Sequence, residues 1–348
     1  MKKQGHVMKK VLVAGGAGFI GSHMCDKLLL RSNISKLVVV DNLWTGRAEN
    51  LAHIKDARLH FVRSDVETLQ TSDKFDEIYH FASPASPPWY MKEPKRTISA
   101  NLLGAFRLLD LLKKGGRFCF TSSSEVYGDP LVSPQPESYK GQVDCTGPRS
   151  SYDESKRCTE SLLFELQRTQ GLDVRVVRPF NCYGPRTRPD DGRAVSNFIT
   201  QALTGRSITV FGDGLQSRSW GYVDDITEGF ARYFWMNETD YRGPLNVGND
   251  REISVLDVAK YVSSLMGGVP IVFKPSPPQD PTNRRPDLTN AKHVMPEWSC
   301  KVSYEEGVLK TLDWFRAEME RAAAKPSKAV ARRPRPQKNT DIGSFSGL

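Results

Sequence analysis

The sequence predicts an α/β fold, a doubly wound parallel sheet with a smaller mixed α/β lobe towards the C-terminus. Three observations predict it. A glycine-rich turn follows the first apolar strand, strands and helices alternate through the first half of the chain, and the pattern becomes mixed from Asp190 onward. Strands that alternate with helices are typical of a parallel sheet covered on both faces.

The individual elements follow from apolar, β-branched runs for the strands and from the longer stretches between them for the helices. The predicted strands are residues 10–14, 36–40, 58–65, 77–82, 117–123 and 173–179, followed in the second half by 208–211, 245–247 and 271–274. The predicted helices of the first half are residues 22–30, 96–114 and 150–170.

The first turn carries glycines at positions 15, 16, 18 and 21, in the spacing G-x-x-G-x-x-G, between a strand and a helix. Such glycines let the backbone approach a pyrophosphate, and the helix N-terminus supplies N–H donors. The second strand ends in Asp41, where a carboxylate binds ribose hydroxyls and repels a 2′-phosphate. We therefore predict a Rossmann-like site for NAD rather than NADP, and prefer this reading to a plain tight turn.

The formal net charge of +9 lies in the ends of the chain. The first ten residues contribute +4 and residues 321–348 contribute +6, which leaves −1 for the rest. A folded surface that binds nucleic acid is therefore not expected. The six cysteines show no C-x-x-C pair and no zinc spacing, which favours a reducing compartment and no metal site.

No apolar run reaches transmembrane length, and the lysine-flanked start has no signal-peptide core, so we expect a cytoplasmic protein without membrane contact. The expected division is a flexible segment 1–8, an NAD-binding Rossmann domain 9–185, and a substrate-binding lobe 186–320 that is interleaved with the first domain. Residues 321–348, rich in Pro, Ala and basic residues, are expected to form a disordered tail.

The candidate catalytic pair is Tyr152 and Lys156, four residues apart and so on one face of a predicted helix. A phenol has a reference pKa near 10 and is a poor base at neutral pH. A nearby ammonium and a positively charged nicotinamide ring would stabilise the phenolate and lower this pKa. The same ammonium can hold the nicotinamide ribose. The sequence therefore predicts an oxidoreductase-type step with Tyr152 as the base.

With these motifs the chain resembles the extended short-chain dehydrogenase/reductase family over residues 9–320. The marks of the resemblance are the glycine turn, Asp41, the segment 121–128 (Thr-Ser-Ser-Ser-Glu-Val-Tyr-Gly), the Tyr152/Lys156 pair and the segment 178–185. The resemblance implies that Ser123 joins the catalytic pair. It also implies cofactor contacts from Gly15, Gly18, Phe19, Ile20, Gly21, Asp41, Asn42, Thr45, Gly46, Asp65, Val66, Ala82, Tyr152 and Lys156.

Within that family the chain is similar to the UDP-glucuronate decarboxylases, also called UDP-xylose synthases. The proline-rich run 82–91 is the most specific segment, and 124–130, 147–149, 152–154, 191–193, 195–198 and 284–287 also match the pattern. Ser155 stands where a glycine is usual and Cys182 where a hydroxyl or another small residue is common. Neither departure touches the implied chemistry.

Ser124 and Glu125 separate the reactions that this fold supports. The similar 4,6-dehydratases carry Asp then Glu at these positions, and simple 4-epimerases usually carry neither carboxylate; here a serine replaces the Asp. The general acid that expels a C6 hydroxyl is therefore missing. The resemblance implies that Tyr152 takes the O4 proton while a hydride passes from C4 to NAD. The resulting β-keto acid loses CO2, C5 is reprotonated, and the same NADH returns the hydride to C4.

The resemblance also implies which residues contact UDP-glucuronate and its product UDP-xylose. Arg284 is expected to grip an anionic part of the substrate, mainly the diphosphate, while donors around residues 83–90 hold the carboxylate. Val210 is expected to lie against the uracil. The expected substrate contacts are Ser83, Pro84, Tyr90, Asn101, Asn181, Arg193, Val210, Arg218 and Arg284.

Three alternatives stay open: another nucleotide-sugar 4-epimerase, a decarboxylase that stops at the 4-keto pentose, and a non-catalytic NAD-binding regulator. Intact Tyr152, Lys156, Ser123 and Glu125 argue against a regulator, since a sensor has no need of them. A homodimer is a family expectation, with helices near 96–112 and 150–167 at the interface.

Overall fold

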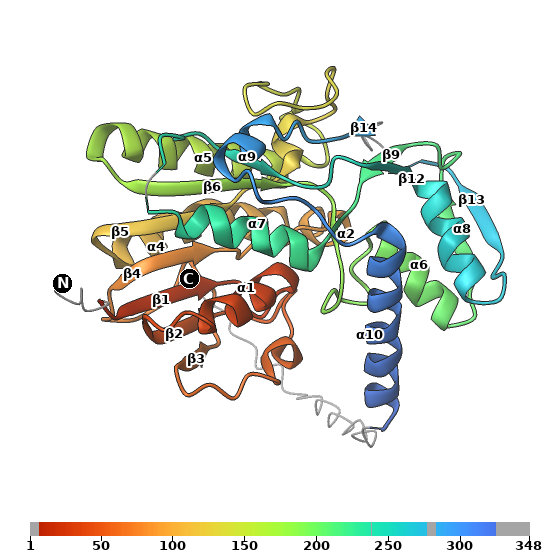
Figure 1. Cartoon of the computed structure of the whole chain (residues 1–348), viewed down its shortest axis with the longest axis horizontal. Helices are drawn as coiled ribbons and strands as arrows, with labels where there is room; N and C mark the ends of the chain where they lie inside the picture. Colours follow the sequence, from red (N-terminus) through yellow and green to blue (C-terminus); the bar gives the residue numbers. More distant parts are fainter. Residues whose placement is uncertain (1–6, 238, 277–282, 325–348) are drawn as a thin grey trace, which may run out of the picture.

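A computed structural model of the chain describes residues 7–237, 239–276 and 283–324. Seven strands form its central sheet in the order β11-β6-β5-β4-β1-β2-β3, and all of them pair in parallel (Figure 1). They are β1 (Lys9–Ala14), β2 (Ile34–Val40), β3 (Leu59–Val62), β4 (Phe75–His80), β5 (Leu112–Thr121), β6 (Asp173–Pro179) and β11 (Leu245–Val247). The predicted doubly wound parallel sheet is confirmed.

Four helices cover the two faces of this sheet: α1 (Phe19–Leu29) and α7 (Val223–Trp235) one face, α4 (Gly104–Leu111) and α5 (Ser150–Gln170) the other (Figure 1). Successive residues of one strand serve opposite faces. Val11 and Val13 pack in the core beneath α1 and α7, whereas Leu12 and Ala14 pack beneath α4 and α5. This is why the strand reads as a continuous apolar run.

The strand order reverses direction between β1 and β4. From β1 the chain proceeds outward to β2 and β3, then returns to place β4 on the other side of β1. Ligands bind at such switch points, outside the carboxyl ends of the strands. The glycine turn after β1 lies at this position.

The predicted helix 96–114 is wrong in detail. The structure has α3 (Pro94–Ile98), a π-helical segment η2 (Ser99–Leu103) and then α4, which ends at Leu111. Lys113 and Lys114 belong to β5, because Leu112 already pairs with Phe75 of β4. The chain then continues through Gly115, whose φ of +75° suits glycine.

Two other predicted ends also differ. Strand β3 ends at Val62, so Asp65 lies in the loop beyond the strand rather than at its end. Helix α10 (Tyr304–Ala324) continues through the first four residues of the predicted disordered tail, where Arg321 pairs with Glu318 at 2.7 Å. The rest of that tail and residues 1–6 lie outside the described residues.

The second half of the chain builds a smaller lobe around its own core, with α6 (Ala194–Leu203), α8 (Val255–Leu265) and α10 (Figure 1). Its short strands are β8 (Ile208–Phe211) paired with β13 (Ile271–Lys274), β7 (Cys182–Tyr183) paired with β10 (Gly221–Tyr222), and β9 (Ser217–Ser219) between β12 (Glu252–Ser254) and β14 (Asn283–Arg284). Between lobe segments the chain returns to the large sheet to form α7, β11 and α9 (Thr289–Val294).

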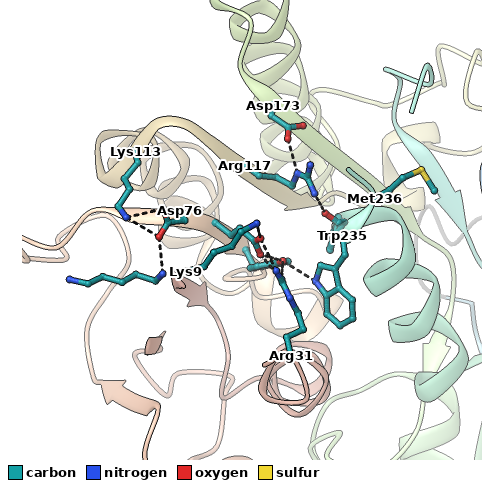
Figure 2. A network of polar contacts seen from close by, with 12 residues as sticks. Lys9, Arg31, Asp76, Lys113, Arg117, Asp173, Trp235 and Met236 are labelled. Atoms are coloured by element: carbon teal, nitrogen blue, oxygen red, sulfur yellow. Dashed lines mark hydrogen bonds and ion pairs between the residues drawn. The ribbon is translucent and has the colours of Figure 1, made fainter. Parts of the chain in front are cut away.

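A polar network that includes Lys9 and Arg31 lies near the amino ends of β1 and β4 (Figure 2). The glycine turn follows the other end of β1. The buried Glu77 of β4 accepts hydrogen bonds from Arg31 at 2.6 and 2.9 Å, from Lys9 at 2.7 Å and from the Tyr79 hydroxyl at 2.6 Å. Burial by itself raises the pKa of Glu77, but Arg31 and Lys9 outweigh burial and lower this pKa to about 2. Glu77 therefore links the segment after α1 and strand β1 to β4.

We predict that Glu77→Gln lowers the free energy of unfolding by about 3 kcal/mol at pH 7, because Arg31 loses its buried partner. The folded-state pKa is depressed, so this contribution is present above the ordinary Glu value of 4.5 and is lost as pH falls towards about 2. Urea denaturation at pH 7 and pH 3 measures it. Equal stability of both forms at pH 7 would contradict the assignment.

Candidate active site

A crevice lies outside the carboxyl ends of β1 and its neighbours, and its floor is the glycine turn that joins β1 to α1. A Cβ on Gly15 would lie 2.5 Å from the backbone of Ala82, and one on Gly21 would lie 2.2 Å from the Gly15 carbonyl oxygen. Gly18, the N-cap of α1, offers no side-chain acceptor to the first N–H groups of the helix. These donors point to a ready site for an anionic group such as a pyrophosphate.

Asp41 lies beside this turn at the end of β2. Its carboxylate accepts hydrogen bonds from the backbone N–H of Ala17 at 3.0 Å and of Leu43 at 2.8 Å. Burial raises the pKa of Asp41, and these backbone donors oppose the shift. A Cβ on Gly46 would come within 2.6 Å of the carboxylate, so only glycine fits there. The residues present thus fit a bound dinucleotide.

Two adjoining pockets follow the crevice and share several lining residues, among them Gly15, Gly18 and Thr45. The first lies at the Asp41 end and includes four further predicted contacts, Asp41, Asn42, Val66 and Ala82. The second includes Phe19, Ile20, Gly21, Ser123, Ser124, Tyr152 and Lys156. Asp65 lines neither pocket; its carboxylate accepts hydrogen bonds from Asn42 at 2.6 Å and from Arg96 at 3.2 Å.

We predict that Asp41→Ala weakens NAD binding by at least about tenfold while leaving UDP-sugar binding unchanged, because hydrogen bonds to a charged acceptor are lost. The preference for NAD over NADP should narrow, since the repulsion of a 2′-phosphate disappears. Calorimetric titration with NAD, NADP and UDP measures the three affinities. An unchanged ratio of NAD to NADP affinity would remove Asp41 from the ribose site.

The predicted catalytic pair lies at the other end of the crevice, on the first turns of α5. Tyr152 is buried, and its ring stacks on that of Tyr90 with centroids 5.0 Å apart. Burial raises the pKa of Tyr152, and a hydrogen bond with Ser123 opposes this shift. The lowered pKa that we expect from Lys156 and the nicotinamide ring together stays a prediction.

Lys156 is buried beneath Tyr152. Its Nζ donates to the carbonyl oxygen of Thr121 at 2.8 Å and lies 4.8 Å from the centroid of the Phe120 ring and 5.7 Å from that of Tyr152. Burial lowers the pKa of Lys156 to about 7. The Lys156 ammonium therefore lies close to the Tyr152 ring, and its lowered pKa brings it nearer to its neutral form at neutral pH.

Glu125 lies in the short helix η3 (Ser124–Tyr127) at the end of β5, directly after Ser123 and Ser124. Its carboxylate is held by two guanidinium groups, Arg284 of β14 at 2.5 Å and Arg149 at the start of α5. Burial would raise the pKa of Glu125, but Arg284 and Arg149 outweigh burial and lower it. The carboxylate therefore stays ionised at neutral pH.

A cavity of about 510 Å³ opens beside this cluster, between the sheet domain and the lobe. Six predicted residues line it: Glu125, Tyr90, Asn181, Arg193, Arg218 and Arg284. Four other predicted substrate contacts do not. Ser83 and Pro84 line the cofactor crevice instead, while Asn101 and Val210 are fully buried behind the walls.

Several lining residues were not among the predicted site residues. Arg149 lines the cavity; it belongs to the segment 147–149 that the family resemblance already singled out, so that segment was the missed signal. Trp44 and Trp89 line the cofactor crevice, and their meeting had no signal in the sequence because they lie 45 positions apart. Within the described ranges no group of three or more His, Cys, Asp or Glu side chains has metal-site geometry.

Comparisons with known proteins agree with this geometry. Residues 11–248 match the NAD dependent epimerase/dehydratase family. UDP-glucuronic acid decarboxylase 5 of Arabidopsis thaliana is 45% identical over 302 residues, 86% of this chain and 87% of that protein. UDP-glucuronic acid decarboxylase 1 of Xenopus tropicalis is 42% identical over 340 residues, 95% of this chain and 79% of that protein.

A solved structure of UDP-glucuronic acid 4-epimerase from Bacillus cereus, in complex with UDP-glucuronic acid and NAD, superposes with a TM-score of 0.77 at 27% identity. It covers 89% of this chain and 99% of its own. Among the described helices, none is both long enough and apolar enough to cross a membrane. The resemblance predicted from the motifs is confirmed: the chain belongs to the NAD-dependent epimerase/dehydratase family, and within it to the UDP-glucuronic acid decarboxylases.

Proposed function

We propose that this chain converts UDP-glucuronate to UDP-xylose and CO2 with bound NAD. One observation carries the proposal: the charge of the cluster beside Tyr152. Arg149 and Arg284 supply two positive charges and Glu125 one negative charge. Burial and Glu125 raise the pKa of the adjacent Asp153, which favours its neutral form. The surplus positive charge suits a substrate that brings its own carboxylate.

Bound NAD supplies the acceptor for the C4 hydrogen and later returns it, so the net reaction is redox-neutral. The protein groups handle the protons. Tyr152 takes the O4 proton and returns it, while Ser123 holds O4 by a hydrogen bond. Ser124 and Glu125 position the sugar ring and the water that protonates C5 after CO2 has left.

We propose that Arg284 meets the C6 carboxylate, whereas the sequence favoured the diphosphate. Its guanidinium donates to Glu125 at 2.5 Å, to the Gly128 carbonyl oxygen at 2.8 Å and to the Ser124 hydroxyl at 3.4 Å. Ser124 neighbours Ser123 at the reacting end of the site. These contacts support a role at the sugar acid, where an incoming carboxylate competes with Glu125 for the guanidinium.

Incubation of the purified protein with UDP-glucuronate, with products identified by mass and NMR, tests the proposed function. UDP-xylose and one CO2 for each substrate consumed are the expected products. UDP-galacturonate would instead assign a 4-epimerase, the activity named for the Bacillus cereus neighbour. A UDP-4-keto pentose as the end product would assign a decarboxylase that omits the second reduction. No reaction would leave a non-catalytic NAD-binding protein.

We predict that Tyr152→Phe lowers turnover by about 10³-fold, because the ring and its stacking on Tyr90 remain while the proton-accepting oxygen is lost. Binding of NAD and UDP should change less than twofold. Steady-state kinetics and titration measure the two effects separately. A rate close to that of the native protein would exclude Tyr152 as the base.

We predict that Arg284→Ala lowers turnover of UDP-glucuronate by about 100-fold while the affinity for UDP stays the same, because the lost guanidinium meets the sugar acid. Arg284→Lys keeps the positive charge but not the planar guanidinium, so its turnover should lie between those of the native protein and Arg284→Ala. Calorimetry with UDP and progress curves with UDP-glucuronate measure these effects. A parallel loss of UDP affinity would restore the diphosphate assignment, and no effect on either would place Arg284 outside the site.

We also propose that the chain forms a homodimer in the cytoplasm. Ile98, Leu103 and Phe106, on the continuous α3-η2-α4 segment, are 43–51% exposed, which is unusual for large apolar side chains gathered on one element. A second copy of the chain that packs its own α4 and α5 against the α3-η2-α4 segment of the first copy would cover these three side chains. All six cysteines carry free thiols, as suits a reducing compartment. Light scattering at micromolar concentration distinguishes a dimer from a monomer.

A further inference from the structure

Two tryptophans meet across the cofactor crevice. Trp44 follows β2 and Trp89 lies in α2 (Pro87–Tyr90), which follows β4. In the sheet these two strands flank β1, whose carboxyl end carries the glycine turn. The Trp44 and Trp89 rings pack edge to face with centroids 6.2 Å apart. Their contact therefore joins the segments that follow the two strands on either side of β1.

Each tryptophan ring also contacts the guanidinium group of one arginine. The Arg96 guanidinium of α3 lies 4.4 Å from the Trp44 ring centroid, and that of Arg188 lies 4.9 Å from the Trp89 ring centroid. Arg188 is itself fixed by Asp190 at 2.7 and 2.8 Å. Four side chains from four separate segments thus form one continuous row: Arg96, Trp44, Trp89 and Arg188.

The backbone beside Trp44 adopts an unfavourable conformation. Leu43, next to Trp44, has a φ of +60°, a left-handed conformation that is uncommon for a γ-branched residue. The turn is held by hydrogen bonds from the Leu43 N–H to Asp41 at 2.8 Å and from the Trp44 N–H to the Asn42 side chain at 2.9 Å. The same turn that places the predicted ribose ligand Asp41 therefore also places Trp44 in the row.

The row joins the two halves of the crevice. Trp44 and Arg96 line the pocket at the Asp41 end, whereas Trp89 and Arg188 line the pocket that holds Tyr152 and Lys156. The Trp44–Trp89 contact therefore lies where the two pockets meet, beside the path that a dinucleotide in both pockets would take.

We infer that Trp44, Trp89, Arg96 and Arg188 act as a clasp that retains the dinucleotide through the whole catalytic cycle. The inference rests on the proposed function, in which the reducing equivalent taken from C4 must return to the same C4. If the reduced cofactor left after CO2 loss, one UDP-4-keto pentose and one free NADH would remain for each substrate oxidised. The clasp keeps these two products from separating.

The test measures cofactor release directly, so it does not depend on decarboxylation. Protein loaded with radiolabelled NAD is chased with unlabelled NAD, and the retained label is followed by rapid filtration. Trp44→Ala should release the label about tenfold faster, because an aromatic pair and a cation–π contact are lost together. Arg96→Gln, which leaves both rings, should release it about threefold faster.

Two variants serve as controls. Trp44→Phe keeps an aromatic ring against Trp89 and should stay within about twofold of the native rate. Trp314→Phe removes an indole from α10, which lines neither cofactor pocket, and should have no effect. Release from both Trp44→Ala and Arg96→Gln within twofold of native would overturn the clasp. Should Trp44→Ala not fold, Arg96→Gln still decides.

With UDP-glucuronate, Trp44→Ala should also divert part of the product to UDP-4-keto pentose, with an equal amount of NADH in the medium. A different outcome is also informative. If Trp44→Ala and Arg96→Gln release the label faster but the native protein forms no UDP-xylose, the clasp is supported and the proposed function is refuted. Both products unchanged, together with unchanged release of label, would refute the clasp alone.

Discussion

The site depends on one partly buried charge cluster, the Glu125 carboxylate between the guanidinium groups of Arg149 and Arg284. A carboxylate with reduced access to water is stabilised by such pairing, and the pairing links three segments. These are the end of β5, the start of α5 and strand β14 of the lobe. The start of α5 also carries Tyr152, so the pairing that joins lobe to sheet also sets the position of the base.

The two ends of the sheet have different roles, one in stability and the other in the candidate site. At the amino ends, Glu77, Arg31 and Lys9 close a fully satisfied network that stabilises the fold. At the carboxyl ends, the glycine turn leaves helix N–H groups without side-chain acceptors, and the arginine cluster holds surplus positive charge. Such groups are available to bind an anionic ligand. The carboxyl ends of the strands are therefore the edge that suits an anionic ligand.

Local features of the sequence predicted the sheet and the cofactor half of the site. Continuous apolar runs predict buried strands, and the Gly15–Gly21 spacing predicts the turn between strand and helix. Tyr152 and Lys156 lie on one face of helix α5 because of their spacing alone. The early end of the predicted helix 96–114 at Leu111 was missed because Leu112 joins β5 through long-range pairing with Phe75. The Trp44–Trp89 contact and the pairing of Arg284 with Glu125 also come from long-range convergence, which residue spacing does not reveal.

The central claim is that oxidation and reduction occur at the same carbon of the same substrate molecule. The most direct measurement uses UDP-glucuronate deuterated at C4, with the product analysed by proton NMR and mass spectrometry. The account predicts UDP-xylose that keeps the deuterium at C4, even when unlabelled NADH is added to the medium. UDP-xylose with protium at C4, or deuterium in the free NADH, would contradict it.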